Sequence, residues 1–477
     1  LKCSRMDDGF GGVVRISNVS DYIAPSQACV IPLRTNTVDE QQELVAVRNR
    51  KDGSGDGKQS DKKVGVKVSI SLADCLACSG CITSAETVLV EEQSITRVFE
   101  ALADRKYSLH VVSVSSASLA SLSAARKASP QAMARLLTRF FVGKGADVVI
   151  DTNIGLQLSL EESWRELQER LSPGVEEKKP SPLLVSACPG FVCYAEKSHS
   201  GLLVPLLSRA KSCQSALGVV VKEWLPTVLS LPSSSTVYHA SVMPCFDRKL
   251  EASRAENRVA GSEEERHVDC VLSTAEILSA LDEFDGDHAS EAESLTDLPP
   301  LFERLPQCLQ SFMNGDVFGM PGNVSGGYLE YAERRWKEEM EQRGYSATSS
   351  AETKKVSSNL ESVTVRTDNG EHELRMARLY GFRNIQNLVR KLKSGKQVAD
   401  YDFVEVMACP SGCANGGGQV RGANTAERAS LTAAVEELHH SLPLQPPPST
   451  SFPIDPSRLQ AHFRPVEPGA MATSLAW

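Results

Sequence analysis

Two cysteines four residues apart, Cys409 and Cys413, are the residues whose type and spacing point most directly to chemistry. A β-rich run at residues 401–407 precedes them, and Pro410 and the three consecutive glycines at 416–418 let the backbone turn tightly around them. A disulfide between them would close a very small loop and stabilise little, whereas two thiolates on one turn can each hold a different iron of a cluster. The pair therefore predicts a ligand site at the end of a strand.

A denser group of thiols lies nearer the N-terminus, where Cys75, Cys78 and Cys81 follow the spacing C-x2-C-x2-C. Bacterial-type ferredoxins hold three corners of a [4Fe-4S] cluster with this spacing. The ferredoxin position four residues after the triad is Ala85 here, so the fourth ligand must come from elsewhere, and Cys29 is the candidate. Structural zinc is the alternative, although zinc sites more often combine two separated pairs of ligands that include histidine.

Composition and charge narrow the class of protein. The 477 residues are 41% hydrophobic, which is enough for two or three domains with a sizeable core, and the net charge of −9 leaves no broad basic surface for nucleic acid. The first residues lack the apolar core of a signal peptide, and no run of about 18 apolar residues predicts a membrane span. We expect a cytoplasmic protein that binds neither nucleic acid nor membrane.

The total of 13 cysteines, odd and unevenly spaced, does not suit a disulfide framework. In a reducing compartment they are metal ligands or buried hydrophobic residues. Isolated cysteines such as Cys213, Cys270 and Cys308 are predicted to belong to the core. No Ser-His-Asp, Cys-His or paired-carboxylate arrangement stands out, so covalent or acid-base catalysis has no visible centre.

Strands and helices alternate from about residue 106, which predicts an α/β fold with a mostly parallel, helix-covered sheet. The predicted strands are at 109–114, 146–151, 182–188, 236–245 and 401–407. One predicted helix starts at the pair Ser129-Pro130, and two others occupy 158–171 and 384–392.

Three of these predicted strands end in a cysteine next to a proline, at Cys188, Cys245 and Cys409. Ligands in open α/β sheets bind beyond the carboxyl ends of the strands, and the prolines fix the local backbone angles. One site can therefore gather these three thiols and that of Cys413.

The cysteine triad, the alternation of strands and helices and the proline-rich end divide the chain into three predicted parts. They are an N-terminal cluster-binding region at 1–105, an α/β domain at 106–435 and a proline-rich, extended or mobile tail at 436–477. Charged stretches within the α/β domain predict solvated insertions. They lie at 251–266, 282–300 and 336–359. A small-residue turn at Ser325 precedes another helix and is either a packing feature or part of the site.

The segments around Cys188, Cys245 and the pair Cys409 and Cys413 resemble the three cluster-binding signatures of iron-only hydrogenases. Together with the triad segment they are most similar to the eukaryotic hydrogenase-like cytosolic iron-sulfur assembly factors, the nuclear prelamin A recognition factor-like family. The resemblance covers residues 20–435. It implies an iron-only hydrogenase-like α/β domain with parallel sheets, preceded by a small ferredoxin-like region.

The resemblance also implies two [4Fe-4S] clusters and a role in delivering clusters to cytosolic and nuclear apoproteins, in the cytoplasm and also in the nucleus. The implied ligands form two quartets, Cys29, Cys75, Cys78 and Cys81, and Cys188, Cys245, Cys409 and Cys413.

Departures from true hydrogenases disfavour hydrogen chemistry. The first of two adjacent cysteines, which relays protons in hydrogenases, is replaced by Ala187, which has no titratable group. The lysine of the second signature is replaced by Arg248, with Lys249 next to it. The positive charge is kept, but the length and geometry of the side chain differ. Cys413 would then complete an ordinary cubane.

The family resemblance extends to the C-terminus, where Leu475 and Trp477 match an element thought to dock onto the cytosolic iron-sulfur targeting complex of WD40-propeller and HEAT-repeat adaptor proteins. A terminal indole is a plausible anchor for a partner's pocket.

The sequence therefore favours a non-catalytic carrier or scaffold that serves apoprotein clients. One alternative is a redox enzyme that passes electrons between its two clusters, and another is an interaction protein with vestigial clusters.

Overall fold

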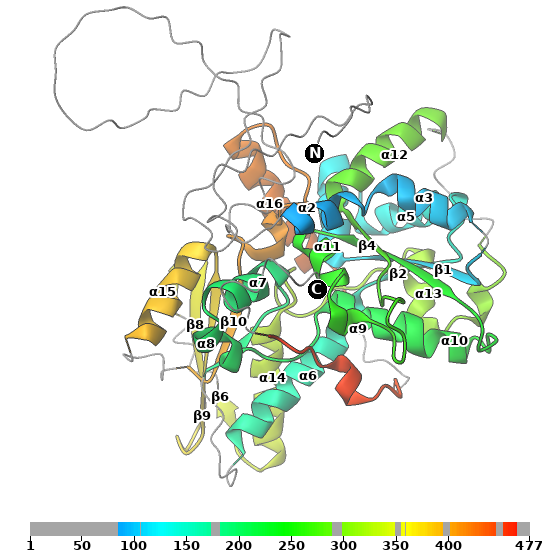
Figure 1. Cartoon of the computed structure of the whole chain (residues 1–477). Coiled ribbons are helices and arrows are strands. Elements are labelled where there is room, and N and C mark those ends of the chain that lie inside the picture. The colour runs from blue at the N-terminus through cyan, green and yellow to red at the C-terminus, as the bar shows by residue number, and fades with distance from the viewer. Residues whose placement is uncertain are drawn as a thin grey trace, which may run out of the picture.

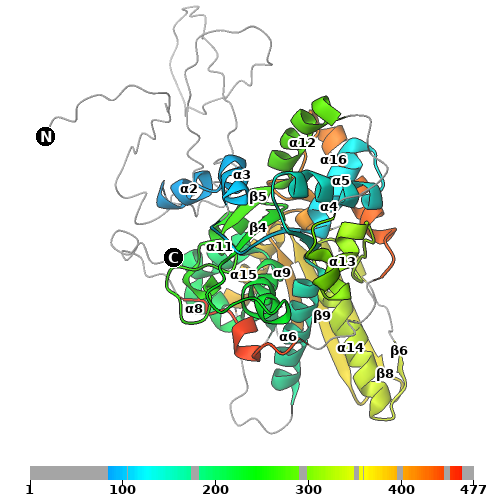
Figure 2. The ribbon, with the colours of Figure 1, turned by 90° about the vertical axis from the view of Figure 1, so that its right-hand side faces the viewer.

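The computed structural model describes residues 84–464, except 105, 173–181, 289–297, 349–353, 358, 395–400 and 445–451. Along these ranges no helix combines the length and the apolar character needed to cross a membrane. Figure 1 shows two sheets side by side, one on each side of the molecule, and Figure 2 shows the same arrangement from the side.

The first sheet has four parallel strands in the order β2-β1-β4-β5. Their bounds are Leu109–Val114 for β1, Val148–Asp151 for β2, Val237–Met243 for β4 and Cys270–Ser273 for β5. Every residue of β1, β4 and β5 is buried. Continuous burial is typical of parallel strands, because helices cover both faces of such sheets.

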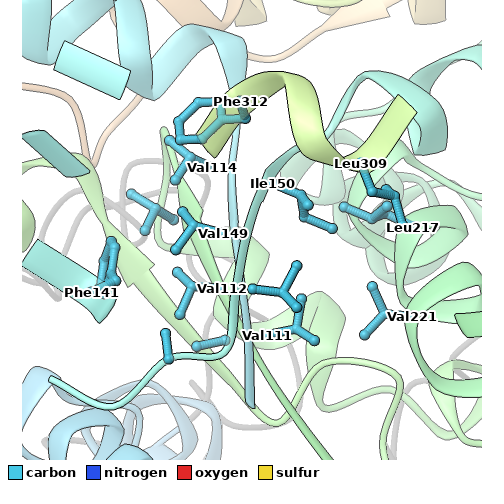
Figure 3. Packing of buried hydrophobic residues seen from close by; sticks show 14 of the residues in the cluster. Val111, Val112, Val114, Phe141, Val149, Ile150, Leu217, Val221, Leu309 and Phe312 are labelled. Atoms are coloured by element: carbon cyan, nitrogen blue, oxygen red, sulfur yellow. The ribbon is translucent and has the colours of Figure 1, made fainter. Parts of the chain in front are cut away.

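Both faces of this sheet carry apolar side chains because neighbouring residues of a strand point to opposite sides. Figure 3 shows Val112 on the same side as Phe141, whereas Val111 lies on the other side, toward Leu217 and Val221. The helices and turns around this sheet are α2 (Ser84–Glu91), α3 (Ile95–Ala103), α4 (Ser116–Arg126), α5 (Pro130–Gly143), α9 (Cys213–Val219), the π-helix η3 (Val220–Trp224), α10 (Leu225–Val228), α12 (Thr274–His288), η5 (Phe302–Arg304) and α13 (Gln307–Asn314).

The second sheet is mixed, in the order β3-β10-β9-β8-β6, with β7 paired to β8. Its strands are β3 (Leu183–Val185), β6 (Ala347–Thr348), β7 (Lys354–Ser357), β8 (Leu360–Thr367), β9 (Glu373–Tyr380) and β10 (Phe403–Met407). Strands β3, β10 and β9 are parallel, whereas β8 runs antiparallel to β9 and to β6. Helices α14 (Tyr328–Gln342) and α15 (Phe382–Lys393) pack against this sheet.

Helix α6 (Asn153–Leu171) joins the two halves, because it packs against α9 beside the first sheet and against α14 beside the second. Helices α7 (Pro189–Ser198) and α11 (Asp247–Ala252) pack against each other between the sheets (Figure 1). The remaining elements are α8 (Ser200–Leu203), η2 (Val204–Leu206), η4 (Ala255–Asn257), η6 (Gly412–Asn415), α16 (Thr425–His440) and η7 (Pro456–Leu459).

The α/β fold with parallel strands is confirmed. The strand predicted at 109–114 has these bounds, and the other four predicted strands are present with shorter bounds. The helix expected at 158–171 starts five residues earlier, at Asn153. The helix expected from Pro130 is also present, and the Ser129 side chain caps it by accepting a hydrogen bond from the Ala132 amide. The antiparallel pair of β8 and β9 was not predicted.

Two of the predicted solvated insertions are wrong in part. Residues 336–342 belong to α14, where Trp336 and Met340 are each 4% exposed. Within 251–266, the Arg254 guanidinium pairs with the Glu196 carboxylate of α7 at 2.7 Å, and both side chains are largely buried. The charges hid the amphipathic period, because a helix can carry many ion pairs on one face and still bury the other.

The extended or mobile tail predicted after residue 440 also differs from the structure at 452–464. The Phe452 ring packs against Trp224 at a centroid distance of 4.9 Å. The Ala461 amide donates to the Arg209 carbonyl at 2.6 Å, and Arg458 pairs with Glu223. This segment is therefore anchored on the α/β domain.

The crossing of α6 and α9 leaves no room for a side chain at Gly155. An added Cβ would overlap the Cys213 carbonyl oxygen and lie 2.7 Å from the Leu217 amide nitrogen. We expect Gly155→Ala to lower the free energy of unfolding by about 1–3 kcal/mol, because overpacking forces the helices apart. Chemical denaturation measures this. Gly201→Ala in α8 is the control, since nothing lies within 4 Å of its added Cβ, and equal stability of the two variants would contradict the expectation.

Candidate metal centre

Three turns at the ends of parallel strands carry the strand-end thiols. Cys188 follows β3 and is the N-cap residue of α7, Cys245 follows β4, and Cys409 follows β10. Cys413 lies four residues further on, in η6. Strands β3 and β10 belong to the second sheet and β4 to the first, so the two sheets supply ligand candidates from opposite sides.

The turn after β10 is in direct contact with the turn after β4. The Gly418 amide donates to the Pro244 carbonyl at 2.9 Å. A Cβ on Gly416 would overlap that carbonyl, and one on Gly418 would lie 3.2 Å from the Cys245 Cα. The glycine run therefore serves this close approach.

The turn after β3 is tied to the same place. The Ser186 hydroxyl donates to the Val406 carbonyl of β10 at 2.6 Å and accepts from the Cys188 amide at 3.1 Å. The backbone amide of Ala408 also bonds the Cys188 sulfur and lowers the pKa of that thiol. Strand-end turns from both sheets thus meet beside α7 and α11.

Burial opposes ionisation of these thiols. It raises the pKa of Cys188, that of Cys245 far above its ordinary value and that of Cys413 to about 12. A ligand must be a thiolate, so a compensating positive charge is needed nearby.

Arg248 of α11 supplies that charge. Its residue is 3% exposed, and its guanidinium lowers the pKa of Cys188, Cys245 and Cys413. Its Nη1 pairs with the Glu251 carboxylate at 2.7 Å. Its Nε is buried and has no hydrogen-bond partner within the part of the chain that the structure describes. An anionic group between the thiols would satisfy this donor.

The donor set consists of cysteine thiols, the usual ligands of iron-sulfur clusters. Among the described residues no group of three His, Cys, Asp or Glu side chains could hold a metal ion. A [4Fe-4S] cluster places one thiolate at each of four separated corners, and with four thiolates it is anionic. The thiols of Cys188, Cys245 and Cys413 lie close enough to the buried Arg248 for its charge to act on them, and Cys409 is four residues before Cys413 in the same turn.

Comparisons with known proteins show the family of this chain. The family described as "Iron only hydrogenase large subunit, C-terminal domain" matches residues 108–417. The "Probable cytosolic Fe-S cluster assembly factor oxy-4" of Caenorhabditis elegans is 42% identical over 99% of this chain and 100% of its own length. The chain belongs to the cytosolic iron-sulfur assembly factor family, within the iron-only hydrogenase-like proteins.

Other members of the assembly-factor family are similar to this chain over nearly its full length. The "Cytosolic Fe-S cluster assembly factor narfl" of Xenopus tropicalis is 38% identical over 93% of this chain and 91% of its own. The "Cytosolic iron-sulfur assembly component 3" of Bos taurus is 38% identical over 91% of this chain and 89% of its own. These relatives are named as assembly factors and not as enzymes.

Solved structures show the shared fold. An [FeFe]-hydrogenase whose structure concerns oxygen inactivation aligns with a TM-score of 0.59 at 23% identity, over 78% of this chain and 99% of that chain. A variant of apo [FeFe]-hydrogenase HydA1 from Chlamydomonas reinhardtii aligns with a TM-score of 0.58, also at 23% identity, over 79% of this chain and 99% of that chain. The predicted hydrogenase-like fold is confirmed.

The structure also places Ala187 and the two adjacent cations Arg248 and Lys249, which the sequence analysis compared with the hydrogenase signatures. Ala187 is 4% exposed and packs in an apolar cluster with Tyr328 and Met407. Lys249 points away from the thiols, because its Nζ bonds the Gln93 carbonyl at 2.7 Å and the Glu276 carboxylate at 2.9 Å. Of the two adjacent cations, Arg248 faces the site.

Cys213 is a neighbour of the site that sequence analysis missed. It was assigned to the core, and it does pack against two apolar clusters. It also lies close to Arg248, which lowers the pKa of the Cys213 thiol, and close to Cys413, whose pKa Cys213 raises. An isolated cysteine gives no spacing signal that could have placed it there. Cys270 and Cys308 pack in or against the core of the first sheet, as predicted.

Six predicted site residues lie outside the described residues, and their assignment stays a prediction. They are Cys29, Cys75, Cys78, Cys81, Leu475 and Trp477.

Removing the Arg248 charge should make the strand-end thiols less reactive. The cation lowers the pKa of Cys413, so Arg248→Met raises that pKa and reduces the thiolate fraction at any given pH. We expect alkylation of Cys413 by iodoacetamide at pH 8.5 in metal-free protein to slow about tenfold, the effect of one pKa unit. Peptide mass spectrometry measures each cysteine separately.

Lys249→Met is the matched control, since it removes the neighbouring cation and also leaves a carboxylate unpaired. It should slow alkylation of Cys270, whose pKa Lys249 lowers, and leave Cys413 unchanged. Equal effects of the two substitutions on Cys413 would show that Arg248 has no special relation to the site.

Proposed function

We propose that this chain is a non-catalytic carrier or scaffold that holds two [4Fe-4S] clusters and takes part in delivering clusters to cytosolic and nuclear apoproteins. The observation that supports the proposal is the contact between the turns that follow β3, β4 and β10, with the buried Arg248 beside Cys188, Cys245 and Cys413. The names of the relatives support the assembly role.

The strand-end quartet would hold one cluster. Thiolates of the four cysteines would ligate its iron atoms, and the Arg248 guanidinium would offset the negative charge. Cys409 and Cys413 are partly exposed and Pro410 is exposed, so this edge of the site lies near solvent. Partial exposure suits a protein whose cluster is to be exchanged.

The second cluster would be held by Cys29, Cys75, Cys78 and Cys81. Packing next to this region supports a link between the two quartets. Helix α2 starts three residues after Cys81, and its Val90 packs against Phe246, which directly follows Cys245, and against Leu250 of α11. The same helix that carries Arg248 is therefore in contact with the segment that follows the triad.

The redox-enzyme alternative would pass electrons between the two clusters. It is less favoured, because Ala187 offers no proton-carrying group where hydrogenases have one, and apolar side chains surround it. The relatives are also named for assembly and not for a reaction.

The partner we propose is the cytosolic targeting complex of WD40-propeller and HEAT-repeat adaptor proteins, reached through Leu475 and Trp477. The relatives are named cytosolic, which supports the cytoplasm as the main location, and a nuclear pool would serve nuclear clients.

Iron and sulfide analysis tests the two quartets. Anaerobically reconstituted full-length protein should contain about eight iron and eight sulfide per chain, and the double variant Cys409→Ser/Cys413→Ser should contain about four of each. The double variant Cys75→Ser/Cys78→Ser should also lose about half. Cys270→Ser, a buried cysteine on β5, should keep the full content. Unchanged iron in either double variant would refute the corresponding cluster. Dihydrogen evolution by the reconstituted protein would instead favour the redox enzyme.

Truncation tests the partner. Removing Trp477 should weaken binding to the reconstituted targeting complex by at least about tenfold, the cost typical of losing a buried aromatic anchor, and leave the iron content unchanged. Pull-down titration measures the affinity. A variant that keeps the aromatic ring, Trp477→Phe, should retain part of it, and equal binding by the truncated chain would end this assignment.

A further inference from the structure

The loop that precedes α14 lies directly behind the Cys413 turn. The Cys413 amide donates a hydrogen bond to the Ser325 hydroxyl oxygen at 2.9 Å. A Cβ on Gly412 would overlap the same hydroxyl and lie 3.0 Å from Cε2 of Tyr380. The Cys413 turn, the loop at Ser325 and the Tyr380 ring are thus closely packed against one another.

A chain of hydrogen bonds continues from Ser325 into the protein. The Ser325 amide donates to Asn323 Oδ1 at 2.8 Å, and Asn323 Nδ2 donates to the Tyr380 hydroxyl at 2.8 Å. The Tyr380 hydroxyl donates in turn to Glu405 Oε1 at 2.6 Å. Four successive hydrogen bonds therefore link the backbone of Cys413 to a carboxylate on β10.

Glu405 is an unusual residue for its position. It is 0% exposed and stands in a strand whose other residues are apolar. Its second oxygen accepts from the Leu329 amide at 3.0 Å, and Arg378 Nε lies 3.6 Å away. An apolar side chain of similar size would fill this space without the desolvation cost of a charge. The hydrogen bonds that the Glu405 carboxylate accepts therefore explain its presence better than packing does.

We propose that Ser325, Asn323, Tyr380 and Glu405 position Cys413 as a ligand and thereby determine how slowly the strand-end site releases its iron. The inference rests on the proposed function, in which Cys413 is a ligand. These are positioning residues, because the chain ends on the ligand's amide and not on the metal. Loss of such outer partners typically weakens metal binding about 10- to 100-fold.

Tyr380→Phe cuts the chain in its middle and keeps the ring that packs against Gly412. The measurement is the rate at which anaerobically reconstituted full-length protein releases iron to a ferrous chelator, in a Cys75→Ser/Cys78→Ser background. We expect release about 10- to 100-fold faster than without the substitution. Ser325→Ala, which removes the contact to Cys413 itself, should act in the same direction.

Tyr328→Phe is the matched control. The Tyr328 hydroxyl is buried 2.7 Å from the Ser159 hydroxyl, next to the same loop, but this hydrogen bond does not lead to Cys413. The iron release rate of the Tyr328→Phe variant should stay close to that of the Cys75→Ser/Cys78→Ser protein without the substitution. Thermal unfolding of the metal-free variants separates a general loss of stability from a loss of positioning.

Equal release rates for Tyr380→Phe and Tyr328→Phe would overturn the inference, as would an unchanged rate for Ser325→Ala. Failure of the underlying assignment looks different. If Cys413→Ser in the same background kept its iron and its electron paramagnetic resonance signal, Cys413 would not be a ligand, and the cluster site and the positioning chain would both be rejected.

Discussion

The candidate site depends on one steric constraint, the close approach of backbone turns from two different sheets. The turn after β10 lies against the turn after β4 so tightly that a Cβ on Gly416 would overlap the Pro244 carbonyl, and Gly418 lies against Cys245. Helix α6 packs on both halves, against α9 beside the first sheet and against α14 beside the second. Without that approach, the four strand-end thiols would belong to two unrelated surfaces.

Electrostatics add a second requirement to this geometry. Burial raises the pKa of Cys245 and Cys413, so protein packing alone disfavours the thiolate form. Arg248 offsets part of this effect, and its buried Nε, which has no hydrogen-bond partner among the described residues, can donate to an anion. Ala187, next to Cys188, is packed among apolar residues.

Segments far from the site in sequence also converge on it. The loop before α14 contacts Cys413 through Ser325, and helix α2 packs on the residues after Cys245. The segment 452–464 reaches α7 at its end, where the Arg464 amide donates to the Glu196 carboxylate. Each adds constraint to an element that carries a ligand candidate. The site is therefore supported by much of the chain and not by the cysteine motifs alone.

The sequence by itself determined the α/β class, the strands that end at Cys188, Cys245 and Cys409, and the family, because local propensity, apolar runs and cysteine spacing are written in neighbouring residues. It did not reveal that Trp336 and Met340 are buried in α14, since the charges around them hid the helical period.

Tertiary structure alone decided that Arg248 and not Lys249 faces the thiols, that Cys213 lies beside them, and that Glu405 reaches Cys413 through Tyr380. These relations join residues tens to hundreds of positions apart. They depend on how two sheets pack, and no local pattern encodes that packing.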